Sequence, residues 1–279
     1  RDMSHRQFVL RGSAAAPEGA AAGGHAMPIG FHSAALIPLI SLFLIGDPAG
    51  AAPRQIEAVP LLPGARIFDA TRTPFGATPD DETDDTAAIQ AAIDAAAAAA
   101  ARAEGDRSIV AQQIVFLPSG TYRISDTLAF PKNVVAKGQP IERSQWLRGA
   151  GMGRTRLRLR PAKEGRLLGE ANAPKPVVQA AEYRFDNKSG GNSNFQLWVT
   201  DLSIIVADDQ PHAVGLSYGS ANMGAVRRVE IVAEGPGGHT GLALVQYNNG
   251  PGLIEHVRVR GFATGVEIND NWGESFTFS

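Results

Sequence analysis

Two hydrophobic periodicities divide the chain into one helical segment and a long series of short strands. Residues 87–104 are rich in alanine and place Ile89 and Ile93 four positions apart, which predicts an amphipathic helix. Aspartate and threonine residues before this segment fit helix N-caps, and Gly105 fits its end. Beyond it, the hydrophobic period changes to two, which predicts strands and no second helix of comparable strength.

Turn residues separate the predicted strands. The strands in the first part of the chain cover residues 66–69, 114–117, 121–124, 127–130, 146–148 and 155–160. In the last of these, Arg156, Arg158 and Arg160 alternate with apolar residues. The arginines therefore share one face of the strand, and the apolar side chains share the other.

The last third of the chain contains a repeat. Apolar–polar–apolar triplets begin at Leu202, Val229 and Val257, and segments that start with glycine begin at Gly215 and Gly241 and again at residue 265. A period of roughly 24–28 residues made of short strands and turns is typical of a solenoid. Stacking such coils about 4.8 Å apart would pair each strand with its neighbours, and the helix at residues 87–104 is expected to cover the open first edge.

Four segments, taken in order, carry a family resemblance. They are Phe68-Asp69, residues 84–93 (DDTAAIQAAI), residues 115–124 (VFLPSGTYRI) and residues 147–151 (LRGAG). Together they resemble the start of the pectate-lyase superfamily domain of the rhamnogalacturonase and epimerase type, and are similar to the start of family 55 glucanases and phage tailspikes. The resemblance implies an all-β fold, a right-handed single-stranded parallel β-helix with an N-terminal capping α-helix, that acts on or binds polysaccharide. Because these motifs are cap and turn elements, they leave the reaction open.

The N-terminal residues predict export. The apolar run at residues 34–45 is shorter than the roughly 20 residues of a membrane-spanning helix, so we expect no stable membrane span. Ala49-Gly50-Ala51 follows it and resembles a signal-peptidase site. We therefore expect a signal peptide and upstream segment at residues 1–51, a linker at 52–65, and a β-helix domain at 66–279 that continues past Ser279. The predicted location is secreted, periplasmic or at the cell surface.

The amino-acid composition limits the kinds of functional site that the chain can form. The chain has 279 residues, no cysteine and a formal net charge of -2. The absence of cysteine excludes disulfides, cysteine-ligated zinc and thiol nucleophiles. The near-neutral charge gives no reason to expect a nucleic-acid partner, and the sequence specifies no oligomeric state.

Four residues are candidates for catalysis. Asp208 and Asp209 follow a predicted strand. Polygalacturonase-like β-helices have a similar aspartate pair, followed later in the chain by a Gly-His element. Here His239 belongs to such an element. The upstream Asn-Thr-Asp element of that family and the final glycine after the histidine are absent, so a turn-forming aspartate pair is the alternative. Glu267 alternates with two apolar residues, so its side chain is expected to face out of the coil. A carboxylate there could take part in glycoside hydrolysis, or could simply belong to a solvated surface.

Other side chains are candidates for substrate contact. Arg156 and Arg158 suit an anionic polymer such as a uronan, or an ion pair with the next coil. Tyr247 and Trp272 suit stacking on sugar rings, whereas Trp198, beside an apolar strand residue, is a candidate for the core.

No cofactor is predicted, and calcium is the alternative. The acidic residues 80–85 offer the carboxylate oxygens that Ca²⁺ prefers, but helix capping explains the same cluster. We expect an exported enzyme, a glycoside hydrolase or a uronan (pectate-type) lyase, acting on polysaccharide in a groove along the β-helix. The alternative is a cell-surface β-helix that binds carbohydrate, or acts as an adhesin, without turnover.

Overall fold

The computed structural model describes most of the predicted domain. The described residues are 64–102, 112–130, 135–136, 139–140, 145–160, 163, 165–180, 195–207, 209–235, 237–245, 249–268 and 276–279. The predicted signal at 1–51 and all but the last two residues of the predicted linker lie outside them. In the described residues, no helix is both long and apolar enough to cross a membrane.

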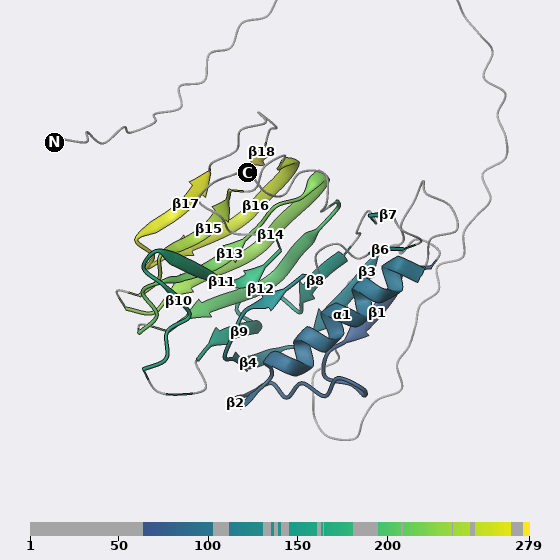
Figure 1. Cartoon of the computed structure of the whole chain (residues 1–279), viewed down its shortest axis with the longest axis horizontal. Helices are drawn as coiled ribbons and strands as arrows, with labels where there is room; N and C mark the ends of the chain where they lie inside the picture. The colour runs from purple at the N-terminus through teal and green to yellow at the C-terminus, as the bar shows by residue number, and fades with distance from the viewer. Residues whose placement is uncertain are drawn as a thin grey trace, which may run out of the picture. The chain divides into compact units, whose positions relative to one another are not determined.

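Successive coils of the chain stack into parallel sheets (Figure 1). The first strands of the coils, the first-strand stack, are β1 (Arg66–Asp69), β3 (Gln113–Leu117), β8 (Gln145–Gly149), the first parts of β12 (Trp198–Val206), β14 (Ala221–Ala233) and β16 (Gly250–Arg260), and β18 (Phe276–Phe278). The second strands, the second-strand stack, are β2 (Asp80–Asp84), β4 (Gly120–Ile124), β9 (Thr155–Leu159) and the second parts of β12, β14 and β16.

A separate parallel sheet completes each coil. This third-strand stack contains β5 (Leu128–Ala129), β11 (Ala173–Gln179), β13 (Ala213–Ser217), β15 (Thr240–Leu244) and β17 (Thr264–Ile268). The antiparallel additions are β10 (Gly169–Glu170), beside β11, and the pair β6 (Val135–Ala136) and β7 (Gln139–Pro140). The predicted all-β class, a right-handed single-stranded parallel β-helix, is confirmed, and connections between parallel strands of this kind are almost always right-handed.

The sequence repeat becomes the strand register. Leu202 pairs with Val229, and Val229 pairs with Val257. Each member of the predicted repeat therefore lies directly above the previous one. The spacing of 27 or 28 residues in the chain is one turn of the coil.

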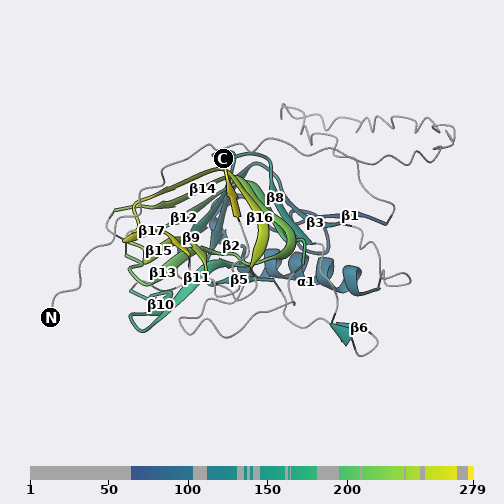
Figure 2. The ribbon, with the colours of Figure 1, turned by 90° about the horizontal axis from the view of Figure 1, so that it is seen from above.

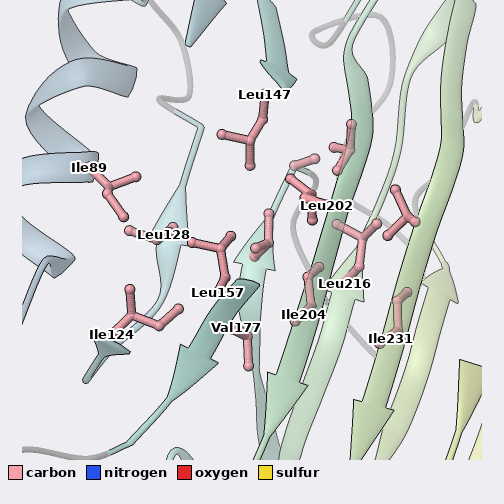
Figure 3. Close-up of a cluster of buried hydrophobic side chains, with 14 of the residues drawn as sticks. Ile89, Ile124, Leu128, Leu147, Leu157, Val177, Leu202, Ile204, Leu216 and Ile231 are labelled. Carbon is pink, nitrogen blue, oxygen red and sulfur yellow. The ribbon is translucent and has the colours of Figure 1, made fainter. Parts of the chain in front are cut away.

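The core lies between the sheets. Leu147, Val199 and Val226 are in register in consecutive first strands and have no exposed surface. Figure 3 shows leucine, isoleucine and valine side chains from all three stacks pointing toward one another. Each fully buried side chain of this size contributes about 1.5–3 kcal/mol, so the column of apolar side chains is the main source of stability.

The helix α1 (Thr86–Arg102) covers the first coil, as the sequence predicts (Figures 1 and 2). Ile89 and Ile93 are fully buried in the core. The side chain of Gln90 donates to the carbonyl of Ala129 at 2.7 Å and accepts from its amide at 2.9 Å. Among the described residues, β5 pairs with a strand on one side only, and this glutamine satisfies the backbone amide and carbonyl of Ala129 there, as a cap must.

A bend in each long strand separates the first stack from the second. Asp201, Arg228 and His256 have positive φ angles of 61°, 50° and 52° in three consecutive coils. Left-handed backbone at the same place in each coil turns the chain from one stack into the next. The arginine carries some strain in this conformation, because aspartate, asparagine, histidine and glycine adopt it more easily.

Candidate functional site

Ionisable side chains gather where the third strands begin. Lys175 pairs in register with Ala213, and the amide of His239 donates to the Ala213 carbonyl. The three residues therefore occupy equivalent places in successive coils. Because neighbouring strands lie about 4.8 Å apart, the backbones of Lys175 and His239 are roughly 10 Å apart along the stack.

A threonine joins two of the predicted catalytic residues. His239 Nδ1 lies 2.9 Å from Thr240 Oγ1, and the Thr240 hydroxyl donates to Glu267 Oε2 at 3.2 Å. Because that hydroxyl gives its one proton to the carboxylate, it accepts from the imidazole, which places a proton on Nδ1 and makes Nε2 the basic nitrogen. We call His239, Thr240 and Glu267 the His–Thr–Glu chain. In it, the histidine is in the position of a general base, and the threonine and glutamate fix its tautomer.

The His–Thr–Glu chain lies on the outer face of the third-strand stack. Thr240 is fully buried, and Glu267 is partly exposed, as the alternation around it predicts. Ala243 pairs in register with Glu267 and belongs to a small apolar cluster with Val214 and Val245, separate from the main core. Apolar neighbours lower the local dielectric constant and strengthen the polar contacts beside them.

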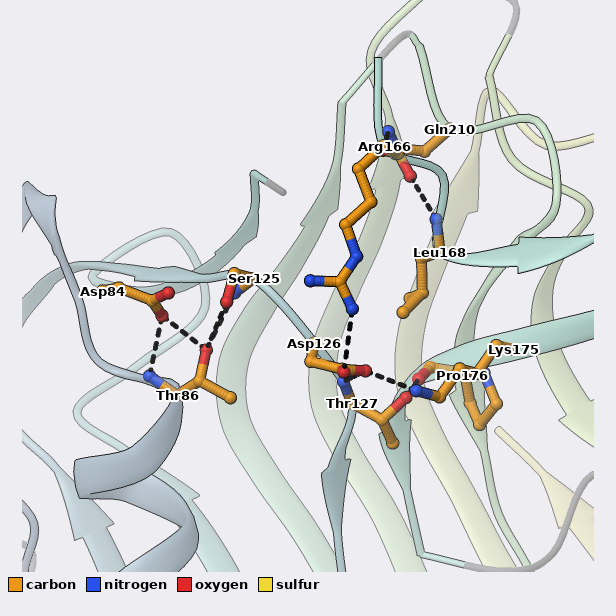
Figure 4. Close-up of polar contacts among 10 residues, drawn as sticks. All are labelled: Asp84, Thr86, Ser125, Asp126, Thr127, Arg166, Leu168, Lys175, Pro176 and Gln210. Carbon is orange, nitrogen blue, oxygen red and sulfur yellow. Dashed lines mark hydrogen bonds and ion pairs between the residues drawn. The ribbon is translucent and has the colours of Figure 1, made fainter. Parts of the chain in front are cut away.

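A second polar group lies two coils earlier (Figure 4). Asp126 accepts a hydrogen bond from Lys175 Nζ at 2.5 Å, and its other oxygen lies 3.6 Å from Arg166 Nη2. Burial alone would raise the pKa of Asp126, but the hydrogen bonds from Lys175 and the Thr127 amide, with the charges of Lys175 and Arg166, hold it below its usual value. Two partly exposed cations therefore share one ionised carboxylate.

The structure places Asp209 in the turn between β12 and β13, where it is exposed. Next to it, the fully buried Gln210 accepts from the Leu168 amide and donates to the Arg166 carbonyl (Figure 4). The Gly238 amide, in the next coil, donates to the Gln210 carbonyl. The turn of Asp209 is thus tied to the Arg166 segment on one side and to the turn before His239 on the other.

The other predicted site residues are elsewhere. Arg156 and Arg158 lie in β9, in the second-strand stack, and the structure does not bring them together with His239 or Glu267. Arg158 pairs with Glu234 at 2.6 Å and lies 3.9 Å from Asp81, which fits the alternative of pairing between coils. Three predicted site residues lie outside the described residues: Asp208, Tyr247 and Trp272.

The acidic residues before α1 act on the helix and its turn. The Asp84 carboxylate accepts from the Thr86 amide and hydroxyl at 3.2 and 2.6 Å, and Asp80 accepts from two amides of its own turn, Glu82 and Thr83. In the part of the chain that the structure describes, no three His, Asp or Glu side chains are grouped so that they could hold a metal ion. The contacts of Asp84 agree with helix capping, and those of Asp80 stabilise the turn before the helix.

Sequence reasoning missed several residues of these groups. Thr240 directly follows the Gly-His element, and Asp126 follows a strand just as Asp209 does, so both carried a positional signal. Lys175 and Arg166 carried none, because they lie between predicted strands with no motif around them. Trp198 is not in the core: its neighbours Leu197 and Val199 point inward, and its partly exposed ring lies on the outer face of the first-strand stack.

A model of the family described as "Rhamnogalacturonase A/epimerase, pectate lyase-like" matches residues 71–279. No curated protein matches the chain significantly.

Three solved structures that are similar to this chain have low sequence identity to it. A protein of Geobacillus virus E2 (ORF18) is 15% identical, with a TM-score of 0.40 over 73% of this chain and 40% of its own. The A-module of a mannuronan C-5 epimerase of Azotobacter vinelandii is 20% identical, with a TM-score of 0.40 over 72% and 53%. The catalytic domain of Agl-KA is 16% identical, with a TM-score of 0.45 over 82% and 39%. The chain spans about half or less of the length of each of these proteins.

Proposed function

This chain belongs to the rhamnogalacturonase A/epimerase family of pectate lyase-like proteins, and on that premise we propose that it is an exported enzyme that cleaves polysaccharide. The His–Thr–Glu chain on the outer face of the third-strand stack carries the proposal. The predicted signal at residues 1–51 supports export.

The reaction that this geometry supports best is β-elimination from a uronate. His239 Nε2 removes the proton on the carbon beside the uronate carboxylate, and the electrons of that bond form a carbon–carbon double bond as the glycosidic carbon–oxygen bond breaks. The leaving oxygen takes a proton from solvent. A histidine suits the first step, because one nitrogen of a neutral imidazole can accept a proton, and Thr240 and Glu267 fix which nitrogen that is.

Cationic side chains on the same stack support an anionic substrate. Removal of a proton beside a carboxylate builds negative charge, which fixed cations stabilise. Lys175 and Arg166 share the single carboxylate of Asp126, so the group retains a net positive charge. Lys175 occupies the same position in its coil as His239 does two coils later. An extended sugar chain that runs along the stack would therefore contact both side chains.

Hydrolysis by two carboxyl groups fits less well. Asp209 precedes β13, and Glu267 is in β17, two coils further along the stack. Two coil spacings are about 10 Å, beyond the roughly 5–5.5 Å of retaining glycosidases and above the roughly 6.5–9.5 Å of inverting ones. The spacing of these two predicted catalytic carboxylates therefore does not support hydrolysis between them.

Digestion of a polysaccharide panel tests the proposal. The 279-residue chain is incubated with pectate, alginate and neutral β-glucan, and both the ultraviolet absorbance of unsaturated uronate and new reducing ends are measured. We expect absorbance to rise with one of the uronans. His239→Gln should lower the rate by at least about a hundredfold, as expected for removal of a general base.

Matched variants separate the alternatives. His256→Asn removes an exposed histidine from the first-strand stack and keeps a residue that tolerates its positive φ, so its rate should equal that of the parent. Reducing ends without absorbance, abolished by Asp209→Asn, would assign hydrolysis instead. Binding to a polysaccharide of the panel without any product would assign the non-catalytic alternative.

A further inference from the structure

Two tryptophans from neighbouring coils lie against each other on the outer face of the first-strand stack. Trp146 of β8 pairs in register with Trp198 of β12, and their ring centroids lie 5.6 Å apart at an interplanar angle of 47°. Leu147 and Val199, the next residue in each strand, are fully buried in the core. Strand alternation therefore turns both rings outward, and both are partly exposed. Large aromatic side chains on the outer face of a coil contribute nothing to the apolar column inside.

Polar contacts hold the first ring in place. Trp146 Nε1 donates to Thr200 Oγ1 at 2.7 Å. The guanidinium of Arg148 lies 5.3 Å from the centroid of the Trp146 ring, within reach of a cation–π contact. Arg148 Nε also lies 3.8 Å from Asp201 Oδ2. The ring is thus fixed before any ligand arrives, which lowers the entropic cost of binding.

Charged groups beside the rings are paired with one another. Asp201 accepts from Arg228 through both oxygens, at 2.5 and 2.9 Å. In the next position along the strands, Arg227 forms an ion pair with Glu255 of the following coil. Asp201 and Arg228 lie at the bend of their coils described above, which brings the two side chains together on this face. The result is a patch of paired charged groups in which Arg148 and Asp201 are buried and Arg227, Arg228 and Glu255 are partly exposed.

We infer that this face binds a neutral polysaccharide, at a site separate from the third-strand stack. Tryptophan rings fit the apolar faces of pyranose rings, and the partly exposed guanidinium of Arg228 and carboxylate of Glu255 match the hydroxyl groups around their edges, while the buried Asp201 holds Arg228 in place. Each arginine of the patch already has a carboxylate partner within it, so none is left to pair with the phosphates of a polyanion such as nucleic acid. The site would hold the protein on an uncharged polymer whether or not the third-strand stack turns over a substrate.

Sugar binding is measured with the 279-residue chain and two neutral probes, insoluble β-glucan in sedimentation and soluble β-glucan oligosaccharides by tryptophan fluorescence. We expect binding by the parent and a loss of affinity of at least about tenfold in Trp198→Ala, since one stacked ring is removed. Trp198→Phe keeps an aromatic ring and should lose less. Arg258→Ala, an exposed substitution in the second-strand stack, should bind like the parent.

The outcomes separate this site from the proposed enzyme site. Thermal unfolding of each variant checks the fold, and if Trp198→Ala does not fold, Arg228→Met and Trp198→Phe are compared instead. Equal affinity of all folded variants, or no binding of either probe by the parent, would overturn the inference. Loss of binding in His239→Gln to the same degree as in Trp198→Ala would also overturn it, because the two sites would then be one. Activity on a uronan that survives Trp198→Ala leaves the proposed function standing in every case.

Discussion

The Asp85 carboxylate accepts a hydrogen bond from the Thr78 amide at 2.7 Å, while its second oxygen is buried and finds no hydrogen-bond partner among the described residues. Burial, with a smaller effect of the neighbouring charges of Asp80 and Asp84, raises the pKa of Asp85 to about 6 against the lowering effect of the Thr78 amide. The folded protein therefore holds a proton on Asp85 more tightly than the unfolded chain does.

This proton makes stability depend on pH. With an unfolded pKa near 3.9, the contribution of Asp85 to the free energy of unfolding is complete below about pH 4 and falls by roughly 2–3 kcal/mol as pH rises through 6. Asp85→Asn removes the titrating group, so this decline should disappear. Denaturant unfolding at several pH values between 4 and 7 measures it.

Asp84 is the matched control with the opposite sign. Although burial alone would raise its pKa, hydrogen bonds from Ser125 and Thr86 hold it below the usual value. The contribution of Asp84 to the free energy of unfolding is present above the pKa of the unfolded chain and is lost as pH falls. Asp84→Asn should therefore flatten only the acid side of the plot of stability against pH. The account of Asp85 is wrong if Asp85→Asn retains the full decline between pH 4 and 7.

Two glycines in register should respond differently to the same substitution. A Cβ on Gly241 would lie 2.1 Å from Val259 Cγ1 and 2.8 Å from the Gly265 carbonyl oxygen, whereas a Cβ on Gly265 meets nothing within 4 Å. Gly241→Ala is expected to destabilise by about 1–3 kcal/mol through overpacking, and Gly265→Ala by far less. Equal unfolding midpoints for the two variants would show that the interior at Gly241 is not closely packed.

Two valines of one column give a test of the core. Val178 and Val266 belong to the inward column of the third-strand stack; Val178 is fully buried, and Val266 is 44% exposed. In the 279-residue chain, Val178→Ala should cost about 2 kcal/mol and Val266→Ala under about 1 kcal/mol, because burial sets the loss. Chemical denaturation compares them. A cost at Val266 as large as that at Val178 would contradict the exposed position of β17.

Removal of one cation tests the role of the Asp126 group. If Lys175 contacts an anionic substrate, Lys175→Met should raise KM for a uronan by about tenfold, the effect of losing one charged hydrogen bond. Lys163→Met removes the same charge from another exposed lysine and should leave KM nearly unchanged. An equal rise in both variants would mean that only net charge matters. Loss of Lys175 should also raise the pKa of Asp126, which NMR titration can follow.

The local pattern of the chain was enough to predict the coils. Leu202, Val229 and Val257 stack because each is the inward residue of its coil, and inward residues must be apolar wherever the coil encloses the core. The helix with Ile89 and Ile93 was predicted for the same reason, since burial of one face imposes a period on the sequence.

The contacts between polar side chains could be predicted less well from the sequence. His239 and Glu267 were singled out and are brought together, but the threonine between them and the group of Asp126 and Lys175 were not. Trp198 was a candidate for the core because its neighbours are apolar, and the structure turns it outward. Alternation fixes which residues share a face but leaves open which face points inward when both neighbours are apolar.

By itself, the sequence determined that this protein is a stack of coils closed at one end by a helix, because repeated burial leaves a repeated pattern. Only the tertiary structure decided which polar side chains meet. Thr240 and Glu267 are 27 residues apart, and Asp126 and Lys175 are 49 apart, yet each pair forms a hydrogen bond. Contacts between coils run across the chain direction, so they depend on the length and path of every turn in between, which no local pattern specifies.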